Sequence, residues 1–151
     1  MSGHEHVRHT PDALPGDTKA GGTTATVIDL EDLGWETWQD PGLKAESAVQ
    51  WKLVFSAERT PTGAISMGLA EIAPDGVLPL HRHEPGEVYH VLEGRGQVEI
   101  GSAVHELYPG RLVFIPPGAW HRTSSAGSSP LRFLFIFPTD SFEEVAYQFE
   151  D

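Results

Sequence analysis

Four side chains have the types and spacing for metal chemistry: His81, His83, Glu87 and His121. In an extended segment, residues i and i+2 share a face, so His81 and His83 project together and Arg82 points away. Glu87 returns to that face if the connection before it is tight. Three imidazoles and one carboxylate suit Fe(II), Mn(II), Co(II), Ni(II) or Zn(II), and they can leave coordination positions open for substrate or water. A His-x-His pair alone is a weak signal, and unrelated surface or core histidines are the alternative interpretation.

Strand parity counted from Glu87 places Tyr89 on the ligand face and His90 on the other face. The Tyr89 phenol is therefore our candidate catalytic group, as a general base or acid or as a substrate contact. The alternative is an ordinary interior tyrosine with a satisfied hydroxyl. His90 is not counted as a ligand.

Two tryptophans, Trp51 and Trp120, are the candidate substrate-binding aromatics, because an aromatic ring can hold an onium group by cation–π contact. Trp51 shares the apolar face of a predicted strand, so a core role is the alternative. We expect core and cavity wall to come from both tryptophans together with Phe55, Phe114, Phe133 and Phe135.

Many short apolar or alternating runs separated by Gly and Pro turns must position these groups. The strands we expect are Val49–Phe55, Ala64–Ala73, Glu87–Glu93, Gln97–Ile100, Ala103–Leu107, Arg111–Ile115, Trp120–Ser124 and Leu131–Phe137. The last run is apolar on both faces and is predicted to be buried on both sides. Asp140 and Ser141 offer an N-cap for a short C-terminal helix from about Phe142 to Gln148. The spacing of the strands predicts an all-β sandwich, barrel or jelly roll.

The spacing around the candidate ligands resembles the two motifs of the cupin superfamily. The first motif is matched by His81-x-His83-x3-Glu87-x6-Gly94, although Asp75 stands where the leading glycine belongs and Gly76 follows it. The second motif is matched by Gly110-x5-Pro116-x-Gly118-x2-His121, with Ser125 in place of the closing asparagine. The resemblance implies a double-stranded β-helix, a jelly-roll barrel that holds one divalent metal ion inside and is often dimeric. We expect Fe(II), with Mn(II), Ni(II), Co(II) and Zn(II) as alternatives.

Within this superfamily, the chain resembles the small cupin-type dimethylsulfoniopropionate lyases in size, in its ligand set and in the Tyr two residues after the Glu. That resemblance implies that Tyr89 removes the proton next to a substrate carboxylate, which the metal binds, and that dimethyl sulfide leaves and acrylate remains. An aromatic such as Trp51 or Trp120 would accommodate the sulfonium. Two alternatives stay open: an Fe(II)-dependent dioxygenase or other oxidoreductase, and a non-catalytic cupin that binds a metal or small molecule.

Composition limits the partners. The chain has 151 residues, no cysteine and a formal net charge of −12. The absence of cysteine excludes disulfides and thiolate ligands. The negative charge argues against nucleic acid and anionic membranes as partners, because both require a basic face. We expect a small-molecule substrate and a homodimer, whose contact the apolar outer positions Val88 and Leu92 suggest.

The N-terminal residues 1–25 are polar and lack an apolar period, so they are predicted to form a flexible tail, with His4, His6 and His9 as solvated side chains. Residues 26–151 are predicted to form a single cupin domain with its barrel core at about 49–138. The start of the sequence has no apolar stretch of the kind that a signal peptide needs, and the longest apolar run is too short to span a bilayer. These features predict a cytoplasmic protein.

Overall fold

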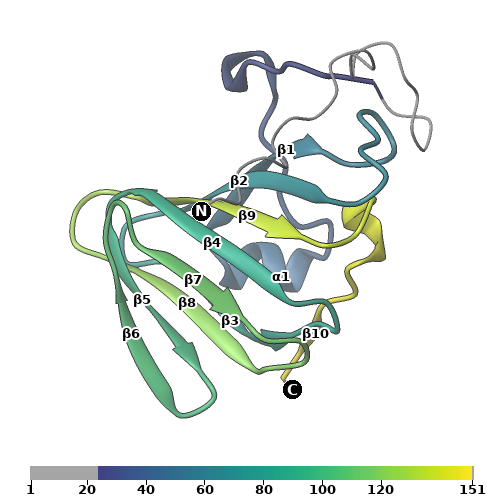
Figure 1. Cartoon of the computed structure of the whole chain (residues 1–151). Coiled ribbons are helices and arrows are strands. Elements are labelled where there is room, and N and C mark those ends of the chain that lie inside the picture. The colour runs from purple at the N-terminus through teal and green to yellow at the C-terminus, as the bar shows by residue number, and fades with distance from the viewer. Residues whose placement is uncertain (1–23, 151) are drawn as a thin grey trace, which may run out of the picture.

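Two five-stranded antiparallel sheets make up the protein in the computed structural model, which describes residues 24–150. Sheet A has the order β1-β2-β9-β4-β7, formed by Val49–Phe55, Ser66–Ile72, Leu131–Phe137, Glu87–Glu93 and Leu112–Ile115. Sheet B has the order β10-β3-β8-β5-β6, formed by Gln148–Phe149, Val77–Arg82, His121–Ala126, Arg95–Ile100 and Ala103–Leu107. The chain crosses repeatedly between the two facing sheets (Figure 1), so the all-β jelly roll predicted from the sequence is confirmed.

Helical structure is limited to short pieces. The 3-10 turns η4 and η5 span Leu30–Asp32 and Phe142–Glu144, and the helix α1 spans Pro41–Glu46. Asp40 begins α1, because its carboxylate accepts hydrogen bonds from the amides of Gly42 and Leu43. Over residues 24–150, no helix is long and apolar enough to cross a membrane.

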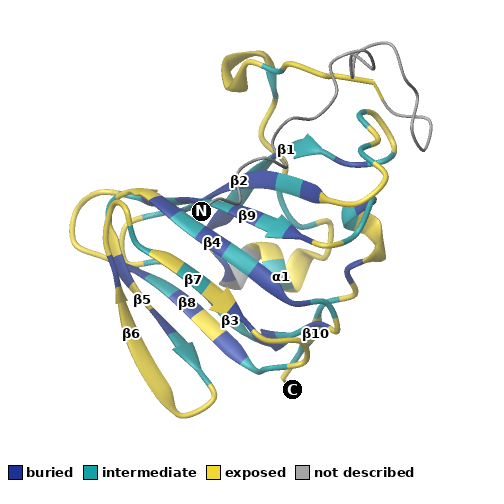
Figure 2. Cartoon of the chain, viewed as in Figure 1, coloured by how far each residue is buried: buried dark blue, intermediate teal, exposed yellow. Residues whose placement is uncertain are grey.

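The core lies between the two sheets, where alternate residues of each strand point inward. Along β9 and the first part of β4, buried positions alternate with partly exposed ones (Figure 2), which is the period of two expected for a strand with one face on a core. Val91, Phe133 and Phe137 are almost completely buried. Burial of side chains of this size contributes about 1.5–3 kcal/mol each.

Three expectations from the sequence need correction. The C-terminal helix is only the single turn η5, capped by Ser141, because Gln148 and Phe149 pair with β3 instead of continuing a helix. The outer face of β9 is half-exposed rather than buried, because no other element of the described chain covers it completely. Phe114 is 62% exposed on the edge strand β7 and does not belong to the core.

The predicted division of the chain into a tail and one domain stays a prediction. Most of the predicted tail, including its three histidines, lies in residues 1–23, outside the described residues. The predicted barrel core at 49–138 contains nine of the ten described strands, and β10 lies beyond it.

Gly94 alone connects β4 of sheet A to β5 of sheet B, at the position that closes the first motif. Its φ is +86°, and an added Cβ would collide with the carbonyl oxygen of Pro130 and lie 2.9 Å from Cα of Leu131. Placing an alanine in the left-handed backbone conformation costs ~1–2 kcal/mol by itself. We predict that Gly94→Ala lowers the free energy of unfolding by more than this amount, because the clash with Pro130 adds to it, and urea denaturation measures the loss.

Gly101→Ala is the matched control, because Gly101 also has a positive φ, +61°, but nothing lies within 4 Å of an added Cβ. Equal losses in the two variants would show that the close approach at Gly94 is unimportant.

Candidate metal centre

The candidate ligands come from both sheets and converge inside the barrel. His81 on β3 is paired across sheet B with His121 on β8, His83 follows β3, and Glu87 begins β4 of sheet A. The amide of Gly118 donates to the carbonyl of His83 at 2.9 Å, which fastens the loop before His121 to the loop that carries His83. The sequence spacing therefore becomes one cluster through strand pairing and this loop contact.

One nitrogen from each of His81, His83 and His121 can lie within 4.8 Å of the others. The Glu87 Oε1 atom lies 3.1 Å from Nε2 of His83 and 3.5 Å from Nε2 of His121. All four residues are at most 4% exposed. The structure thus brings together the four predicted ligands, with three imidazoles and a carboxylate sharing one water-poor space.

Backbone carbonyls fix the orientation of all three imidazoles. The Nδ1 atoms of His81, His83 and His121 lie 2.7, 2.9 and 2.9 Å from the carbonyl oxygens of Pro79, Pro85 and Ala119, each two residues away. A carbonyl only accepts hydrogen bonds, so Nδ1 carries the proton and Nε2 of a neutral ring keeps a free lone pair.

Two of the three Nε2 atoms have no hydrogen-bond partner. Nε2 of His81 and Nε2 of His121 are buried and make no hydrogen bond to any residue in 24–150. The 3.5 Å separation of His121 Nε2 from Glu87 is an ion-pair distance and too long for a good hydrogen bond. Buried polar atoms are rarely left unpaired, and a ring fixed through Nδ1 with Nε2 free is the usual arrangement of a metal-ligating histidine. The residues present therefore fit a divalent metal ion.

The electrostatics of the cluster also favour metal binding. Burial and the proximity of His121 lower the pKa of His81 to about 3, so this ring is neutral at physiological pH. Burial alone would lower the pKa of His83, but the hydrogen bond and charge of Glu87 outweigh it and raise that pKa. Burial likewise opposes ionisation of Glu87, but the nearby imidazole of His121 and the hydrogen bond with His83 lower its pKa overall. Glu87 is thus a carboxylate in a low-dielectric space, where a cation would be strongly attracted.

A small cavity of about 30 Å³ lies between the two sheets and reaches the cluster at Glu87. Its lining includes Glu87 and residues from distant parts of the chain: Trp38, Val49, Trp51, Ala70, Leu78, Tyr89, Phe133, Phe135, Phe142 and Tyr147. Such a volume holds about one water molecule. Aromatic and aliphatic groups form most of the wall, so the few polar atoms on it stand out.

Tyr89 lies on this wall, as strand parity predicted. It is fully buried, and its hydroxyl lies 2.8 Å from Oγ1 of Thr123 on the opposite sheet. Burial and the negative charge of Glu87 raise the pKa of Tyr89 well above its usual value. The hydroxyl therefore has a proton-exchange partner and an environment that favours the neutral phenol.

The two candidate tryptophans have different positions. Trp51 lines the cavity. Trp120 does not line it, and it lies in the loop immediately before β8. Its ring instead lies 4.7 Å from the guanidinium of Arg82. Trp120 is therefore not retained as a substrate-binding residue.

Tyr147 is a residue of the site that the sequence did not reveal. Its ring stacks on His81 with centroids 5.0 Å apart and meets His83 edge-on at 5.1 Å. It precedes β10, where Gln148 pairs with Arg82 and its side-chain oxygen accepts a hydrogen bond from Nε of Arg82. A two-residue strand is too short to show a period, so no sequence pattern placed Tyr147 here.

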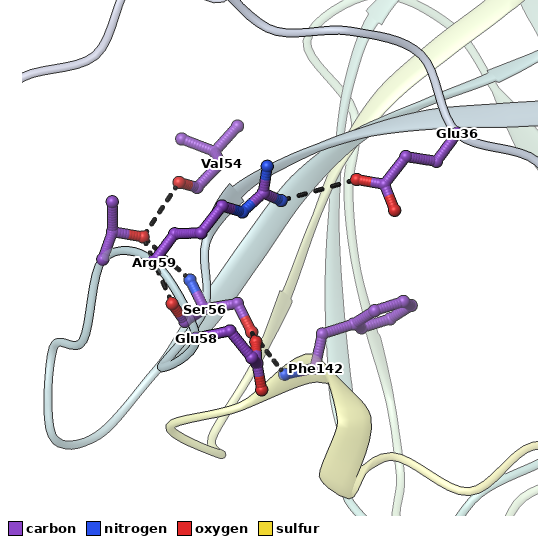
Figure 3. A network of polar contacts seen from close by, with 7 residues as sticks. Glu36, Val54, Ser56, Glu58, Arg59 and Phe142 are labelled. Atoms are coloured by element: carbon purple, nitrogen blue, oxygen red, sulfur yellow. Dashed lines mark hydrogen bonds and ion pairs between the residues drawn. The ribbon is translucent and has the colours of Figure 1, made fainter.

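A polar network fastens the segment that carries Phe142 and Tyr147. Glu58 accepts hydrogen bonds from the hydroxyls of Ser141 and Ser56, which lower the pKa of Glu58. The amide of Phe142 donates to Oγ of Ser56 at 2.9 Å (Figure 3). These contacts join the loop after β1 to the chain after β9, which descends to β10 along one side of the barrel (Figure 1).

Comparisons with known proteins agree with this geometry. Residues 68–137 match the Cupin domain family. The chain is 34% identical over 141 residues to the dimethylsulfoniopropionate lyase DddW of Ruegeria pomeroyi, covering 93% of this chain and 86% of that protein. The chain belongs to the cupin family.

Solved structures show the same fold. The polyketide cyclase RemF of Streptomyces resistomycificus superposes with a TM-score of 0.69 at 21% identity, covering 85% of this chain and 87% of that one. A chain from the crystal structures of the DMSP lyases RdDddP and RnDddQII gives a TM-score of 0.66 at 17% identity, covering 79% and 63%. At these identities the likeness concerns the fold alone.

We predict that the wild-type protein binds about one equivalent of Fe(II) or Mn(II) per chain and that His81→Ala loses most of it, because the cluster loses a fixed neutral nitrogen. Metal content after anaerobic loading and desalting, measured by mass spectrometry, tests this. His105→Ala is the control, since His105 is exposed on β6. Full metal retention in His81→Ala would exclude that residue as a ligand.

Proposed function

We propose that this protein is a metal-dependent lyase that cleaves dimethylsulfoniopropionate into dimethyl sulfide and acrylate. The observation that carries the proposal is a fully buried phenol, Tyr89, on a cavity that Glu87 also lines, and Oε1 of Glu87 lies 3.1 and 3.5 Å from Nε2 of His83 and His121. The similarity to a dimethylsulfoniopropionate lyase over 93% of the chain supports this reaction in preference to others known for the fold.

In this proposal His81, His83, Glu87 and His121 hold one divalent ion, and Fe(II) is the ion we propose. When bound, such an ion supplies Lewis acidity toward a substrate carboxylate. The three imidazoles are already oriented by backbone carbonyls, so little reorganisation of the protein is needed for binding.

Tyr89 is the proposed base. In the elimination, a proton leaves the carbon next to the carboxylate, a carbon–carbon double bond forms, and the carbon–sulfur bond breaks with its electron pair going to sulfur. Tyr89 must first lose its own phenol proton to solvent, which a divalent cation held by the neighbouring ligands would favour. The phenolate then accepts the substrate proton, and the high pKa caused by burial makes it a strong base. Thr123, at 2.8 Å, holds the hydroxyl in place in either protonation state.

The aromatic wall of the cavity suits the sulfonium end of the substrate. Trp51 and Phe142 contribute aromatic surface beside the two phenols of Tyr89 and Tyr147. A sulfonium binds to such surface by cation–π contact. The cavity of about 30 Å³ is smaller than this substrate, so side chains of the wall must shift when it binds.

We predict that the metal-loaded protein releases dimethyl sulfide from dimethylsulfoniopropionate without oxygen and that Tyr89→Phe lowers kcat by ~100-fold or more. Headspace gas chromatography with Fe(II), Mn(II), Co(II), Ni(II) and Zn(II) in turn measures this, and the metal content of the variant should stay unchanged.

Tyr108→Phe is the matched control, because Tyr108 is 38% exposed and far from the cavity lining. A greater loss in Tyr147→Phe than in Tyr89→Phe would transfer the role of base to Tyr147. If the protein binds metal but releases no dimethyl sulfide with any of the metals, this lyase activity is rejected. Oxygen uptake with another small molecule would then favour the oxidoreductase alternative, and metal binding without any turnover would favour the non-catalytic one.

We also propose a homodimer formed through the outer face of sheet A. A groove of about 330 Å³ lies there, lined by Gly86, Glu87, Phe137 and a largely apolar group that includes Ile65, Val88, Phe114, Pro117, Ile136 and Pro138. Next to it, Leu112 is 63% exposed on the same edge strand as Phe114. Large exposed apolar side chains beside a free strand edge favour association with another sheet.

Phe114→Glu is predicted to convert the dimer to a monomer while metal content is retained, because a carboxylate would be buried at the contact. Sedimentation equilibrium measures the mass. Val104→Glu, at a 56% exposed position on β6 of sheet B, is the control and should stay dimeric. A wild-type monomer at micromolar concentration would contradict the proposal.

A further inference from the structure

Two tryptophans line the same cavity, and their indole N–H groups are in opposite situations. Nε1 of Trp38 donates a hydrogen bond to Oγ of Ser47 at 3.1 Å. Nε1 of Trp51 is buried and has no acceptor among the described residues. The fold thus provides a hydrogen-bond acceptor for the indole N–H of Trp38 but none for that of Trp51.

A buried N–H without an acceptor at this position lowers the stability of the folded protein. Indole Nε1 only donates, so no internal rearrangement of its own proton can relieve it. Leaving a buried donor without a partner costs about 1–3 kcal/mol, whereas a phenylalanine would supply aromatic surface without that cost. The arrangement is therefore explained most simply if a bound species supplies the acceptor.

Both the main chain and the ring of Trp51 are restrained. The backbone N–H and carbonyl of Trp51 are hydrogen-bonded to the backbone of Glu36, at 3.0 and 2.7 Å, which fixes the main chain that carries the ring. Trp38 and Phe142 both pack edge-on against the ring, with centroids 5.0 and 6.3 Å from its centroid. The donor is held in place before any ligand arrives.

Within the described part of the chain, no arginine or lysine lines the cavity, so an anionic ligand finds no cationic side chain from those residues there. Its only polar side chains besides the tryptophans are Glu87 and the two tyrosines. Glu87 accepts hydrogen bonds and is part of the metal cluster, and the Tyr89 hydroxyl is engaged with Thr123. Among residues 24–150, Trp51 Nε1 is thus the N–H on a residue of this wall that has no acceptor.

We propose that Trp51 Nε1 donates a hydrogen bond to a carboxylate oxygen of the ligand and so selects small carboxylates and orients them in the cavity. This inference rests on the proposed function, because that function supplies the carboxylate. It adds a donor for that group in the protein itself, besides any metal. Because Nε1–H lies in the plane of the indole and a cation–π contact uses the face of the ring, Trp51 can donate to the carboxylate from its edge and still belong to the aromatic wall that holds the sulfonium.

Binding of acrylate tests the proposal without turnover. Co(II)-loaded protein is titrated with acrylate, and the visible absorption bands of Co(II) give the Kd. We expect Trp51→Phe to bind acrylate about 10-fold more weakly, which corresponds to ~1.4 kcal/mol, with unchanged Co(II) content. Trp120→Phe is the matched control, since the Trp120 ring lies against Arg82 outside the cavity, and it should bind as the wild type does.

A second measurement covers the case in which Trp51→Phe does not fold. In the Zn(II)-loaded, 15N-labelled wild type, the Trp51 Nε1–H resonance should move downfield when acrylate is added, because its hydrogen becomes bonded to an anionic oxygen. Replacing each of the other tryptophans by phenylalanine assigns the resonance by elimination.

The outcomes separate this inference from the lyase activity. A weakened Kd and a shifted resonance, without dimethyl sulfide from any metal form, would support the carboxylate donor and reject the lyase. Dimethyl sulfide formation with an unchanged Kd in Trp51→Phe would support the lyase and overturn the donor. Absence of acrylate binding, or an indole resonance that acrylate leaves unmoved, would also overturn it and leave a water molecule as the partner of Trp51.

Discussion

The orientation of three buried imidazoles is the constraint on which the rest of the structure depends. Each Nδ1–H is held by a carbonyl two residues away, so the ring direction is set by the local backbone. The rigid strands β3 and β8 then bring two of the rings together. A ring that could rotate would lose the shared Nε2 direction, and metal affinity depends on that direction.

Enclosure gives these groups their chemistry. Within the barrel, burial keeps His81 neutral, while contacts with histidines keep Glu87 ionised. The same burial raises the pKa of Tyr89, and the C-terminal segment adds Tyr147 over His81. The Glu58 network and the pairing of β10 with β3 fasten that segment at both ends. The side of the barrel near the cluster is therefore closed by residues distant in sequence.

The two faces of sheet A differ in their surroundings and in their side chains. Its inner face carries Glu87 and Tyr89 beside the cavity, and its outer face carries Val88 and the half-exposed side of β9. Because alternate residues of a strand point to opposite faces, one strand contributes side chains both to the site inside the barrel and to the apolar surface outside it. The separation explains how a change at the outer surface can leave the cluster intact.

The sequence by itself determined the fold class and the cluster, because period-two patterns and His-x-His spacing are local and the two motifs fix glycine turns such as Gly94. It also placed Tyr89 correctly, since parity is counted along one strand. Only the tertiary structure decided that Trp51 lines the cavity and Trp120 does not, and that Tyr147 stacks on His81. Those positions depend on how separate segments pack. The local sequence predicted a C-terminal helix, but pairing of Gln148 and Phe149 with β3 prevailed.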